Sequence, residues 1–316
     1  MKRMPHRERG VALLIALLTV ALAAVLIAGL LDRGELALAR TRNALRSEQA
    51  EAYALALEGY AAEVLVKDLQ DGEEDSNTDL WASPLPPQQV PGGVILASLK
   101  DLNGCFNLNN LGPPDDGTWL TMFGRLLAAV GVDAEIAGAV KDWIGPSDST
   151  DGYYLAQAVP YRSAQRAFAH VSELRLVRGV TSDVYARLAP YVCALPAGTQ
   201  INVNTASVPV LQTLGDISKA QAESLWQNGQ AHWSGSQFWH DWQGVTVDAN
   251  VVSSNRVGTA SSYFLARGDI RLDEVPFTFY SLIERTQGSI RVIERSRGSD
   301  DALVAPALGP ASVRSR

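Results

Sequence analysis

The apolar residues of the chain are concentrated near its start. Residues 11–31 read VALLIALLTVALAAVLIAGLL and contain no charged side chain, whereas the preceding ten residues hold Lys2, Arg3, Arg7 and Arg9. At 1.5 Å per residue an uncharged helix of this length is about 30 Å long, which matches the hydrocarbon core of a bilayer. The pattern therefore predicts a single transmembrane helix over 11–31, with the basic residues 1–10 on the cytoplasmic side.

Three interpretations fit this start. A secretory signal peptide would be cut after Ala21-Leu22-Ala23, although the apolar run continues past that point. A plain anchor would be kept whole. The junction of Arg9-Gly10 with Val11 also resembles a type IV prepilin leader, which implies cleavage between Gly10 and Val11, retention of the helix and N-methylation of Val11.

The fifth position after that junction departs from the resembling pattern. Most prepilins have a glutamate there, which neutralises the terminal amine of a neighbouring subunit, but this chain has Ile15. An unpaired ammonium in an apolar bundle costs several kcal/mol. The substitution suits a subunit at the end of a fibre better than a repeating one.

Helical periodicity continues past the apolar run, over 32–70. The apolar residues return to one face and predict an amphipathic stalk helix. They are Leu38, Leu45, Ala52, Leu55, Ala56 and Val64.

Two groups of strand patterns flank a long helical stretch. Residues 71–111 begin with an acidic, Pro-rich segment, expected to be a solvated loop, and continue into a strand at 93–102 with a turn at Asn103-Gly104. Five acids between Asp71 and Asp79 do not have the spacing of an EF-hand loop. Residues 261–297 predict a meander that pairs with the 93–102 strand, and 298–316 have the composition of a disordered tail. The meander strands are expected at 261–272, 276–284 and 289–296.

The region 112–260 predicts helices separated by Gly and Pro. These helices are expected at 119–130, 134–144, 163–177 and 182–191.

Several motifs in this region, together with the leader, resemble the minor pseudopilin K family of type II secretion systems. They are FNLNNL at 106–111, DWIGPSDSTDGYY at 142–154, VSELRLVRGV at 171–180 and YARLAPYVCALPAGTQINVNTAS at 185–207. The resemblance implies an α+β fold in which a long N-terminal helix and an antiparallel sheet carry a large all-α insert, resembling sterile-alpha-motif or helix-hairpin-helix units. The insert is expected in two parts, about 112–197 and 198–260.

The same resemblance implies a non-enzymatic role in assembly. The chain would be anchored in the bacterial inner membrane by one span, with its bulk in the periplasm, and would form the tip of the pseudopilus. Expected partners are the I, J and H minor pseudopilins, the major pseudopilin, the prepilin peptidase and the inner-membrane assembly platform.

Composition supports an anchored acidic domain. The 316 residues include 27 Lys and Arg, 34 Asp and Glu, and 47% apolar residues, and the mean hydropathy of −0.01 averages the apolar run with an ordinary domain. Removing residues 1–10 takes away four basic residues and one acid, which changes the formal charge from −7 to −10. This charge balance excludes a polybasic nucleic-acid-coating protein.

The two cysteines, Cys105 and Cys193, are far apart in the sequence. In a chain exported to an oxidising compartment they suggest one disulfide, although two buried free thiols remain the alternative. Without a C-x-x-C motif, zinc binding and redox catalysis are not expected.

Asp142, Asp148 and Asp151 lie on a turn-rich segment and are the best metal candidates. Carboxylate oxygens suit Ca²⁺, and in the resembling family this loop binds calcium. The loop is shorter here and has Gly145 where the family commonly has an acid, so an acidic loop without metal is the alternative.

A nucleic-acid-binding protein of a DNA-uptake pilus system is the alternative function. INVNTA at 201–206, followed by LQTLGDISKAQAESL at 211–225, resembles a helix-hairpin-helix unit. Asp216 follows Gly215 where phosphate would approach, and no basic stripe surrounds the segment, so nucleic acid is not an expected partner. Asn202 and Asn204 are expected to cap helices and hold the turn.

Overall fold

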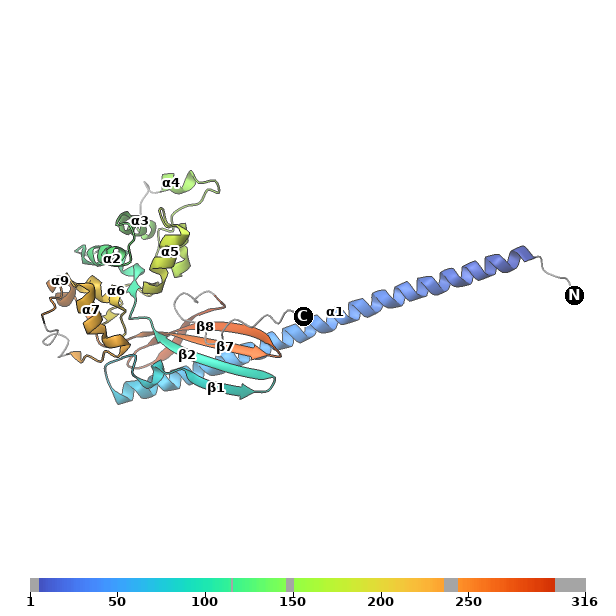
Figure 1. Cartoon of the computed structure of the whole chain (residues 1–316), viewed down its shortest axis with the longest axis horizontal. Helices are drawn as coiled ribbons and strands as arrows, with labels where there is room; N and C mark the ends of the chain where they lie inside the picture. The colour runs from blue at the N-terminus through green and yellow to red at the C-terminus, as the bar shows by residue number, and fades with distance from the viewer. Residues whose placement is uncertain (1–5, 115, 146–150, 236–243, 299–316) are drawn as a thin grey trace. The chain divides into compact units, whose positions relative to one another are not determined.

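The computed structural model describes residues 6–114, 116–145, 151–235 and 244–298, and for residues 6–10 only the backbone. It contains an N-terminal helix, a five-stranded antiparallel sheet and a helical insert (Figure 1). The chain forms two compact units, residues 1–53 and 54–316. The predicted tail and Asp148 lie outside the described residues.

The first helix is continuous. Helix α1 (His6–Asp71) contains the predicted span and the predicted stalk without a break. Its apolar stretch is fully exposed within the structure and is long and apolar enough to cross a membrane. The described part of the first unit therefore consists of this helix, up to Tyr53.

The second unit is built on the sheet, whose strands run in the order β1-β2-β7-β8-β9. The predicted strands all appear, within a few residues of the expected bounds. The strands are β1 (Leu85–Val90), β2 (Gly93–Asp101), β7 (Tyr263–Leu272), β8 (Val275–Arg285) and β9 (Ile290–Ser296).

The prediction of a solvated loop is wrong for strand β1 and for the segment before it. The segment forms a short 3-10 helix, η1 (Leu80–Ala82), and then an edge strand. Pro86 and Pro87 are compatible with this strand because only one of its sides pairs. Asp75 is 1% exposed and Trp81 2%, so part of this acidic segment is core.

The two faces of the sheet have different partners. On strand β7, Phe264 faces a cluster with Ala61 and Leu65 of α1, whereas Tyr263 and Leu265 belong to the cluster that contains the two cysteines. Because side chains alternate along a strand, β7 joins α1 on one face to the insert on the other.

The helical insert lies between β2 and β7 in the sequence and gathers beyond one end of these strands (Figure 1). In the described part of the insert, two short strand pairs and several turns separate the helices. The elements are β3 (Phe106–Asn107), η2 (Leu108–Leu111), α2 (Thr118–Ala129), α3 (Glu135–Ile144), α4 (Asp151–Leu155), η3 (Val171–Leu176), α5 (Ser182–Leu188), η4 (Ala189–Tyr191) and β4 (Val192–Cys193). They continue with β5 (Ile201–Asn202), α6 (Val208–Leu211), η5 (Gln212–Leu214), α7 (Lys219–Trp226), η6 (Gln227–Gly229), α9 (Ala249–Ser253) and β6 (Val257–Gly258).

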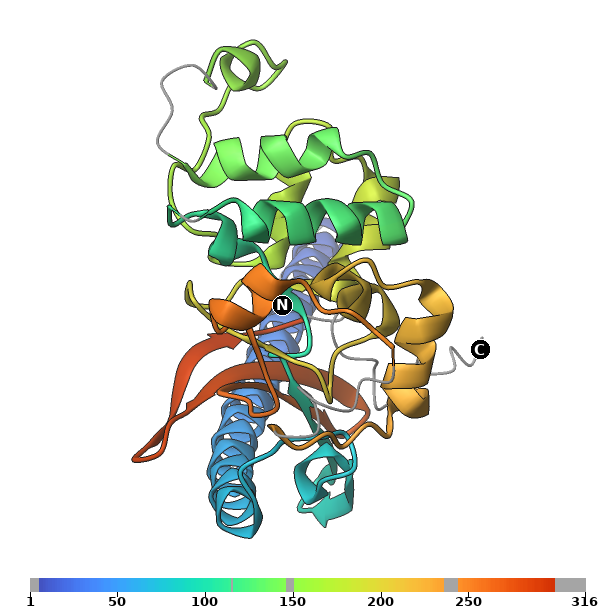
Figure 2. The ribbon, with the colours of Figure 1, turned by 90° about the vertical axis from the view of Figure 1, so that its left-hand side faces the viewer.

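One cluster of buried apolar side chains runs through both expected parts of the insert, from Phe106 to Val257. Phe106 stacks on Phe123 with ring centroids 5.2 Å apart, and Leu211 and Leu225 belong to the same cluster. Figure 2 shows the two groups of helices, one above the other. They therefore share one core.

Three buried asparagines of the FNLNNL motif fix the loops of the insert. Asn107 accepts a hydrogen bond from the Leu195 N–H at 3.0 Å, and Asn110 accepts one from the Gly198 N–H at 2.8 Å. Asn109 donates to the Phe168 carbonyl at 3.0 Å and accepts from the Phe168 N–H at 2.7 Å. Buried backbone groups need hydrogen-bond partners. The asparagine side chains provide them at these loops, where no helix or strand does.

The predicted helix at 163–177 is wrong. Only η3 forms there, and residues 163–170 are irregular. Gln165 has a left-handed φ of 48° and donates its N–H to the Trp143 carbonyl at 2.9 Å. Together with the bonds of Asn109 to Phe168, these long-range contacts outweigh the helical pattern of the sequence.

The structure contains the disulfide between Cys105 and Cys193, with Cα atoms 5.9 Å apart. Both sulfurs lie in the cluster with Leu102 and Tyr280, at the joint of sheet and insert. Nearby, Gly104 approaches the backbone of Thr205 so closely that a Cβ would lie 2.5 Å from the Thr205 carbonyl oxygen. The joint is therefore closed by covalent and steric constraints together.

We expect the Cys105→Ala/Cys193→Ala variant to lose about 4–5 kcal/mol of unfolding free energy, because the bond closes a long loop. Urea unfolding of the mature chain in detergent micelles measures this loss, and dithiothreitol on the unmodified chain should reproduce it. An unchanged midpoint after reduction would contradict a stabilising disulfide.

Candidate functional site

The candidate site includes the face of α1 that points away from the sheet. In the second unit, Ala61 and Leu65 are buried against the sheet, whereas Leu55, Val66 and Leu69 are 54%, 46% and 38% exposed. Residues 55, 59, 62, 66 and 69 follow the three-four spacing of one helix face. In the first unit Leu38 and Leu45 are both 59% exposed.

Five residues of the predicted apolar stripe are exposed, and the sixth, Val64, is not. Val64 lies on the sheet side, beside Leu99 and Ala266. The exposed row instead has a seven-residue spacing through Leu38, Leu45, Ala52, Gly59 and Val66. A seven-residue apolar repeat on an uncovered face is typical of helices that pack against other helices.

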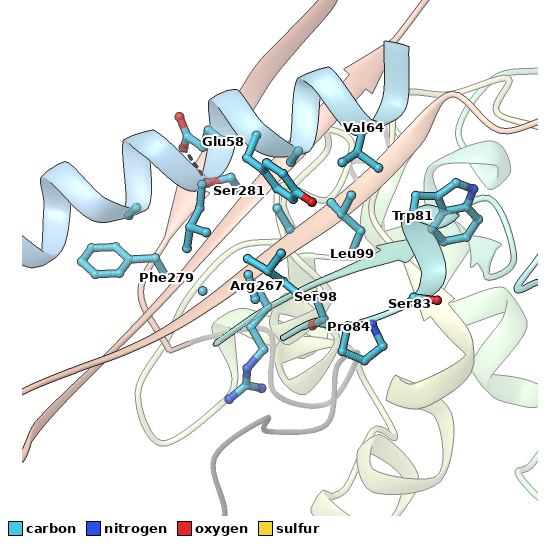
Figure 3. Close-up of a pocket in the computed structure, with 18 of the residues that line it drawn as sticks. Glu58, Val64, Trp81, Ser83, Pro84, Ser98, Leu99, Arg267, Phe279 and Ser281 are labelled. Atoms are coloured by element: carbon cyan, nitrogen blue, oxygen red, sulfur yellow. Dashed lines mark hydrogen bonds between the residues drawn. The ribbon is translucent and has the colours of Figure 1, made fainter. Parts of the chain in front are cut away.

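A groove of about 310 Å³ separates α1 from the η1–β1 segment. Figure 3 shows Val64 of α1, Leu99 of β2 and Pro84 around the same apolar space. Glu58 borders this groove and accepts hydrogen bonds from Ser281 Oγ at 2.6 Å and from Arg295 Nε at 2.7 Å. Burial raises the pKa of Glu58, but the bonds from Arg295 and Ser281 outweigh it and lower this pKa overall.

The C-terminal end of α1 is attached to the sheet by a buried ion cluster. Arg285, at the end of β8, donates to Asp68 Oδ2 at 2.8 Å and to both oxygens of Asp75 at 2.5 Å. The side chains of Arg285, Asp68 and Asp75 are 3%, 12% and 2% exposed. We name Arg285, Asp68, Asp75 and Asp101 the Arg285 cluster.

Asp101 brings the insert into this cluster. Its carboxylate, at the end of β2, accepts hydrogen bonds from the hydroxyl of Thr205, from Ser261 Oγ at 2.8 Å and from the Asn103 N–H at 2.7 Å. Ser261 donates its own N–H to Asp75 Oδ2 at 2.7 Å. The cluster therefore joins α1, the acidic segment, two strand ends and the insert.

Asp68 and Asp75 share one buried guanidinium, with Asp101 close by, and burial is the largest influence on the pKa of each of the three carboxylates. The pKa of Asp68 is raised from 3.8 to about 6, because burial and the nearby Asp75 raise it more than Arg285 lowers it. Burial also raises the pKa of Asp75 and of Asp101.

The same corner contains the carboxylates of Asp68, Asp75 and Asp79, which lie within 4.8 Å of one another. The oxygens of Asp68 and Asp75 already accept from Arg285. Asp79 accepts from the Ser76 N–H at 2.7 Å and from Ser76 Oγ at 2.9 Å. Protein donors therefore occupy these carboxylates.

Comparison with known proteins decides the family. The profile for Type II secretion system (T2SS), protein K matches residues 104–197. The type II secretion system protein K of Pseudomonas aeruginosa is 35% identical over 97% of each chain, and that of Pectobacterium carotovorum subsp. carotovorum is 30% identical over 93% of this chain and 98% of the relative. The chain belongs to the type II secretion system protein K family.

A solved structure agrees with this assignment. A chain in the crystal structure of the GspK–GspI–GspJ complex from the type 2 secretion system of enterotoxigenic Escherichia coli superposes with a TM-score of 0.73 and 29% identity. The match covers 82% of this chain and 99% of that one. The α+β fold and the role of a minor pseudopilin in type II secretion follow from these comparisons.

Within this protein K fold, Gly10 lies in α1 and Val11 and Ile15 are each 57% exposed. Cleavage before Val11 and its N-methylation stay predictions, as does the consequence of Ile15 at the fifth position.

The predicted calcium ligands are described only in part. Asp142 is exposed on α3, and Asp151 begins α4. Asp151 accepts from Ser163 N–H at 3.1 Å and from Arg162 at 2.9 Å. The Ser163 backbone bond is the largest cause that lowers the pKa of Asp151.

In the segment that resembles a helix-hairpin-helix, the turn at Gly215 packs closely against another part of the backbone. Gly215 forms a bridge with Val247, and the Asp248 N–H donates to the Leu214 carbonyl at 2.8 Å. A Cβ on Gly215 would lie 2.4 Å from the Thr246 carbonyl oxygen. This close backbone pairing accounts for a glycine at this position.

Asn202 and Asn204 hold turns, as predicted, but do not cap helices. Asn202 accepts the Asn204 N–H at 2.9 Å and donates to Ser261 Oγ at 2.7 Å, which connects the insert to the Arg285 cluster. Asn204 accepts the Trp233 N–H at 2.6 Å. The sequence did not indicate the Arg285 cluster, because Asp75 and Arg285 are 210 residues apart.

The raised pKa of Asp68 predicts how stability changes with pH. An acid whose pKa is higher in the folded state binds more protons there, so its stabilising contribution is lost as the pH rises through about 6. We expect the unfolding free energy to fall between about pH 4 and pH 6, that is, from the ordinary pKa of 3.8 to the folded-state pKa of about 6. Asp68→Asn should remove about 1 kcal/mol of that change, after allowance for solvent screening.

The control for this measurement is Glu63→Gln, an exposed carboxylate on the same helix. Urea unfolding at several pH values should show the full slope in the control. An equal slope in Asp68→Asn and the unmodified chain would contradict the role of Asp68.

Proposed function

We propose that this minor pseudopilin occupies the tip of the periplasmic pseudopilus and supports export of folded proteins across the outer membrane. The observation that carries this proposal is the place of the insert. Within the second unit, the bonds of Asp68 and Asp75 to Arg285, and of Asp101 to Thr205, hold the insert beside the C-terminal end of α1. A domain in this place extends a fibre at its end.

The exposed row on α1 is the proposed contact with other pseudopilins. Leu55, Val66 and Leu69 face away from the sheet, and Gly59 between them leaves room for a close partner helix. The GspK relative of known structure was crystallised with GspI and GspJ. We therefore propose I-type and J-type minor pseudopilins as direct partners, with the H-type and major pseudopilins below them.

The proposal also covers how the chain is processed and anchored in the membrane. Prepilin peptidase cuts between Gly10 and Val11, and the helix that follows holds the chain in the inner membrane at the assembly platform. The basic residues before Gly10 favour the cytoplasmic side for residues 1–10 and the periplasm for the domain. Ile15 leaves the subunit without the carboxylate that would receive another subunit's terminal amine.

We expect Gly10→Ala to block cleavage and secretion. The mass of the N-terminal peptide should show N-methyl-Val11 in the unmodified chain and the uncut leader in the variant. Ile15→Glu should be tolerated or mildly harmful, because a terminal subunit has no neighbour to neutralise. Unchanged processing of Gly10→Ala would contradict the leader assignment.

We expect the Leu55→Glu/Val66→Glu variant to weaken the complex with I-type and J-type pseudopilins at least about tenfold, since each charge must be desolvated at a helix contact. Both side chains are exposed, so the thermal midpoint should not change. Lys67→Glu is the control because this exposed residue lies on another face of α1. Equal recovery of the complex with all three proteins would contradict the proposed contact.

Calcium binding by Asp142, Asp148 and Asp151 stays a proposal, supported by the oxygen donors and the turn-rich sequence. Calorimetry should detect binding that is lost in the triple Asp→Asn variant. Arg162→Gln should tighten binding, because it frees the Asp151 oxygen that the guanidinium occupies. The absence of heat at millimolar Ca²⁺ would contradict the proposal.

A further inference from the structure

The far end of the insert exposes an unusual set of apolar side chains. Beyond α1, the large apolar residues exposed in the described part of the chain are few, and four of them lie between residues 153 and 176. These four are Tyr153, Leu155, Val159 and Leu176, with exposed fractions of 43%, 46%, 79% and 46%. Figure 2 shows α4, which carries two of them, beyond α2 and α3.

Hydrogen bonds connect the two segments that carry these residues, 153–161 and 176–178. Tyr161 donates its hydroxyl to the Leu176 carbonyl at 2.9 Å, and Tyr154 Oη accepts the Arg178 N–H at 3.3 Å. Below them, the rings of Trp143 and Tyr154 pack edge to face with centroids 5.2 Å apart. The segments that carry the exposed side chains are therefore held by hydrogen bonds and by packed aromatic rings.

Two arginines accompany the apolar residues. Arg175 lies over the Tyr185 ring at 4.3 Å, and Arg178 lies over the Tyr153 ring at 5.8 Å. Asp142 lines the same small hollow as Arg178. Within the described residues, however, no carboxylate oxygen makes an ion pair with either guanidinium at 4.0 Å or less. We name the four apolar residues with Arg175 and Arg178 the α4 patch.

Both signs of charge occur around the α4 patch. Residues 151–191 contain five arginines and three acids, whereas the whole chain has a formal charge of −7. Three of these arginines, Arg162, Arg166 and Arg187, pair with the three acids. Arg175 and Arg178 are the two arginines of this segment outside these pairs, and Asp142 lies in the same hollow as Arg178.

We propose that the α4 patch binds an acidic segment of a protein in which Asp or Glu stands beside aliphatic or aromatic residues. A guanidinium held over a tyrosine ring is oriented for a carboxylate, and the adjacent exposed side chains bury the partner's apolar residues. Two arginines are fewer than the clusters of about four to eight that bind anionic lipid surfaces. The surface therefore favours a peptide over a membrane.

The test uses the mature full-length chain in detergent micelles and fluorescein-labelled peptides. One probe alternates Glu with Leu and Phe, a second replaces Glu by Lys, and a third replaces the apolar residues by Ser. Fluorescence anisotropy should show binding of the first probe, at least about tenfold weaker binding of the other two, and weaker binding at high salt.

Arg175→Gln/Arg178→Gln should weaken binding of the first probe at least about tenfold. The matched control, Lys219→Gln/Arg291→Gln, removes two exposed charges from α7 and β9 and should change it less than about twofold. Leu155→Ser tests the apolar part separately, since this exposed side chain can be replaced without loss of a core contact.

Three results would overturn the proposal: no binding of the acidic apolar probe, an equal loss in the control variant, or equal binding of the Glu–Ser probe. Vesicles of anionic phospholipid should not compete with the probe. Competition that Arg175→Gln/Arg178→Gln abolishes would assign the surface to lipid and contradict a peptide partner. Complex formation with other pseudopilins does not enter this measurement, so its outcome is independent of the proposed tip position.

Discussion

The arrangement of the second unit depends on one buried guanidinium. Arg285 is 4% exposed and contacts Asp68 and Asp75, which themselves carry raised pKa values because of burial. A buried charge that loses its partner costs several kcal/mol, so these groups must stay together. Since they come from the end of α1, from the acidic segment and from β8, their pairing fixes how helix and sheet meet.

The insert follows from the same constraint. Its two connections to the sheet pass Asp101 and Ser261, which are hydrogen-bonded to each other and to the rest of the Arg285 cluster. The disulfide closes the neighbouring corner on the opposite face of β7. A large helical domain is thereby held at the end of α1, while the opposite face of that helix stays uncovered. This division suits an assembly subunit, because one side of α1 builds the domain and the other is available to partner helices.

Local patterns predicted much of this fold. The uncharged run at 11–31, the strands around Ile95 and Phe264 and the helices at 119–130 and 134–144 have periodicities that the structure keeps. Strand β1 was missed because Pro86 and Pro87 argue against a strand unless it lies at an edge. The helix at 163–177 failed because Asn109 and Trp143 bind its backbone from distant positions.

The candidate site was less predictable than the fold. The stripe on α1 was visible, but Val64 was placed on the wrong face, because a sequence with apolar residues on two sides does not say which side meets the sheet. The acids at 71–79 were expected in solvent, and only the distant Arg285 explains why Asp75 is buried. The cysteine pair was inferred from export and sequence separation, and the structure places both residues where a bond forms.

A double-mutant cycle between Arg285→Met and Asp75→Asn tests most directly whether the Arg285 cluster holds sheet, helix and insert together. Urea unfolding of the oxidised mature chain gives the free energies of the two single variants and the double variant. We expect Arg285→Met alone to cost about 3–5 kcal/mol and the two changes to be coupled by at least about 2 kcal/mol, because the second change removes a charge that the first leaves unpaired. Additive effects, or a cost for Arg285→Met below about 1 kcal/mol, would contradict this expectation.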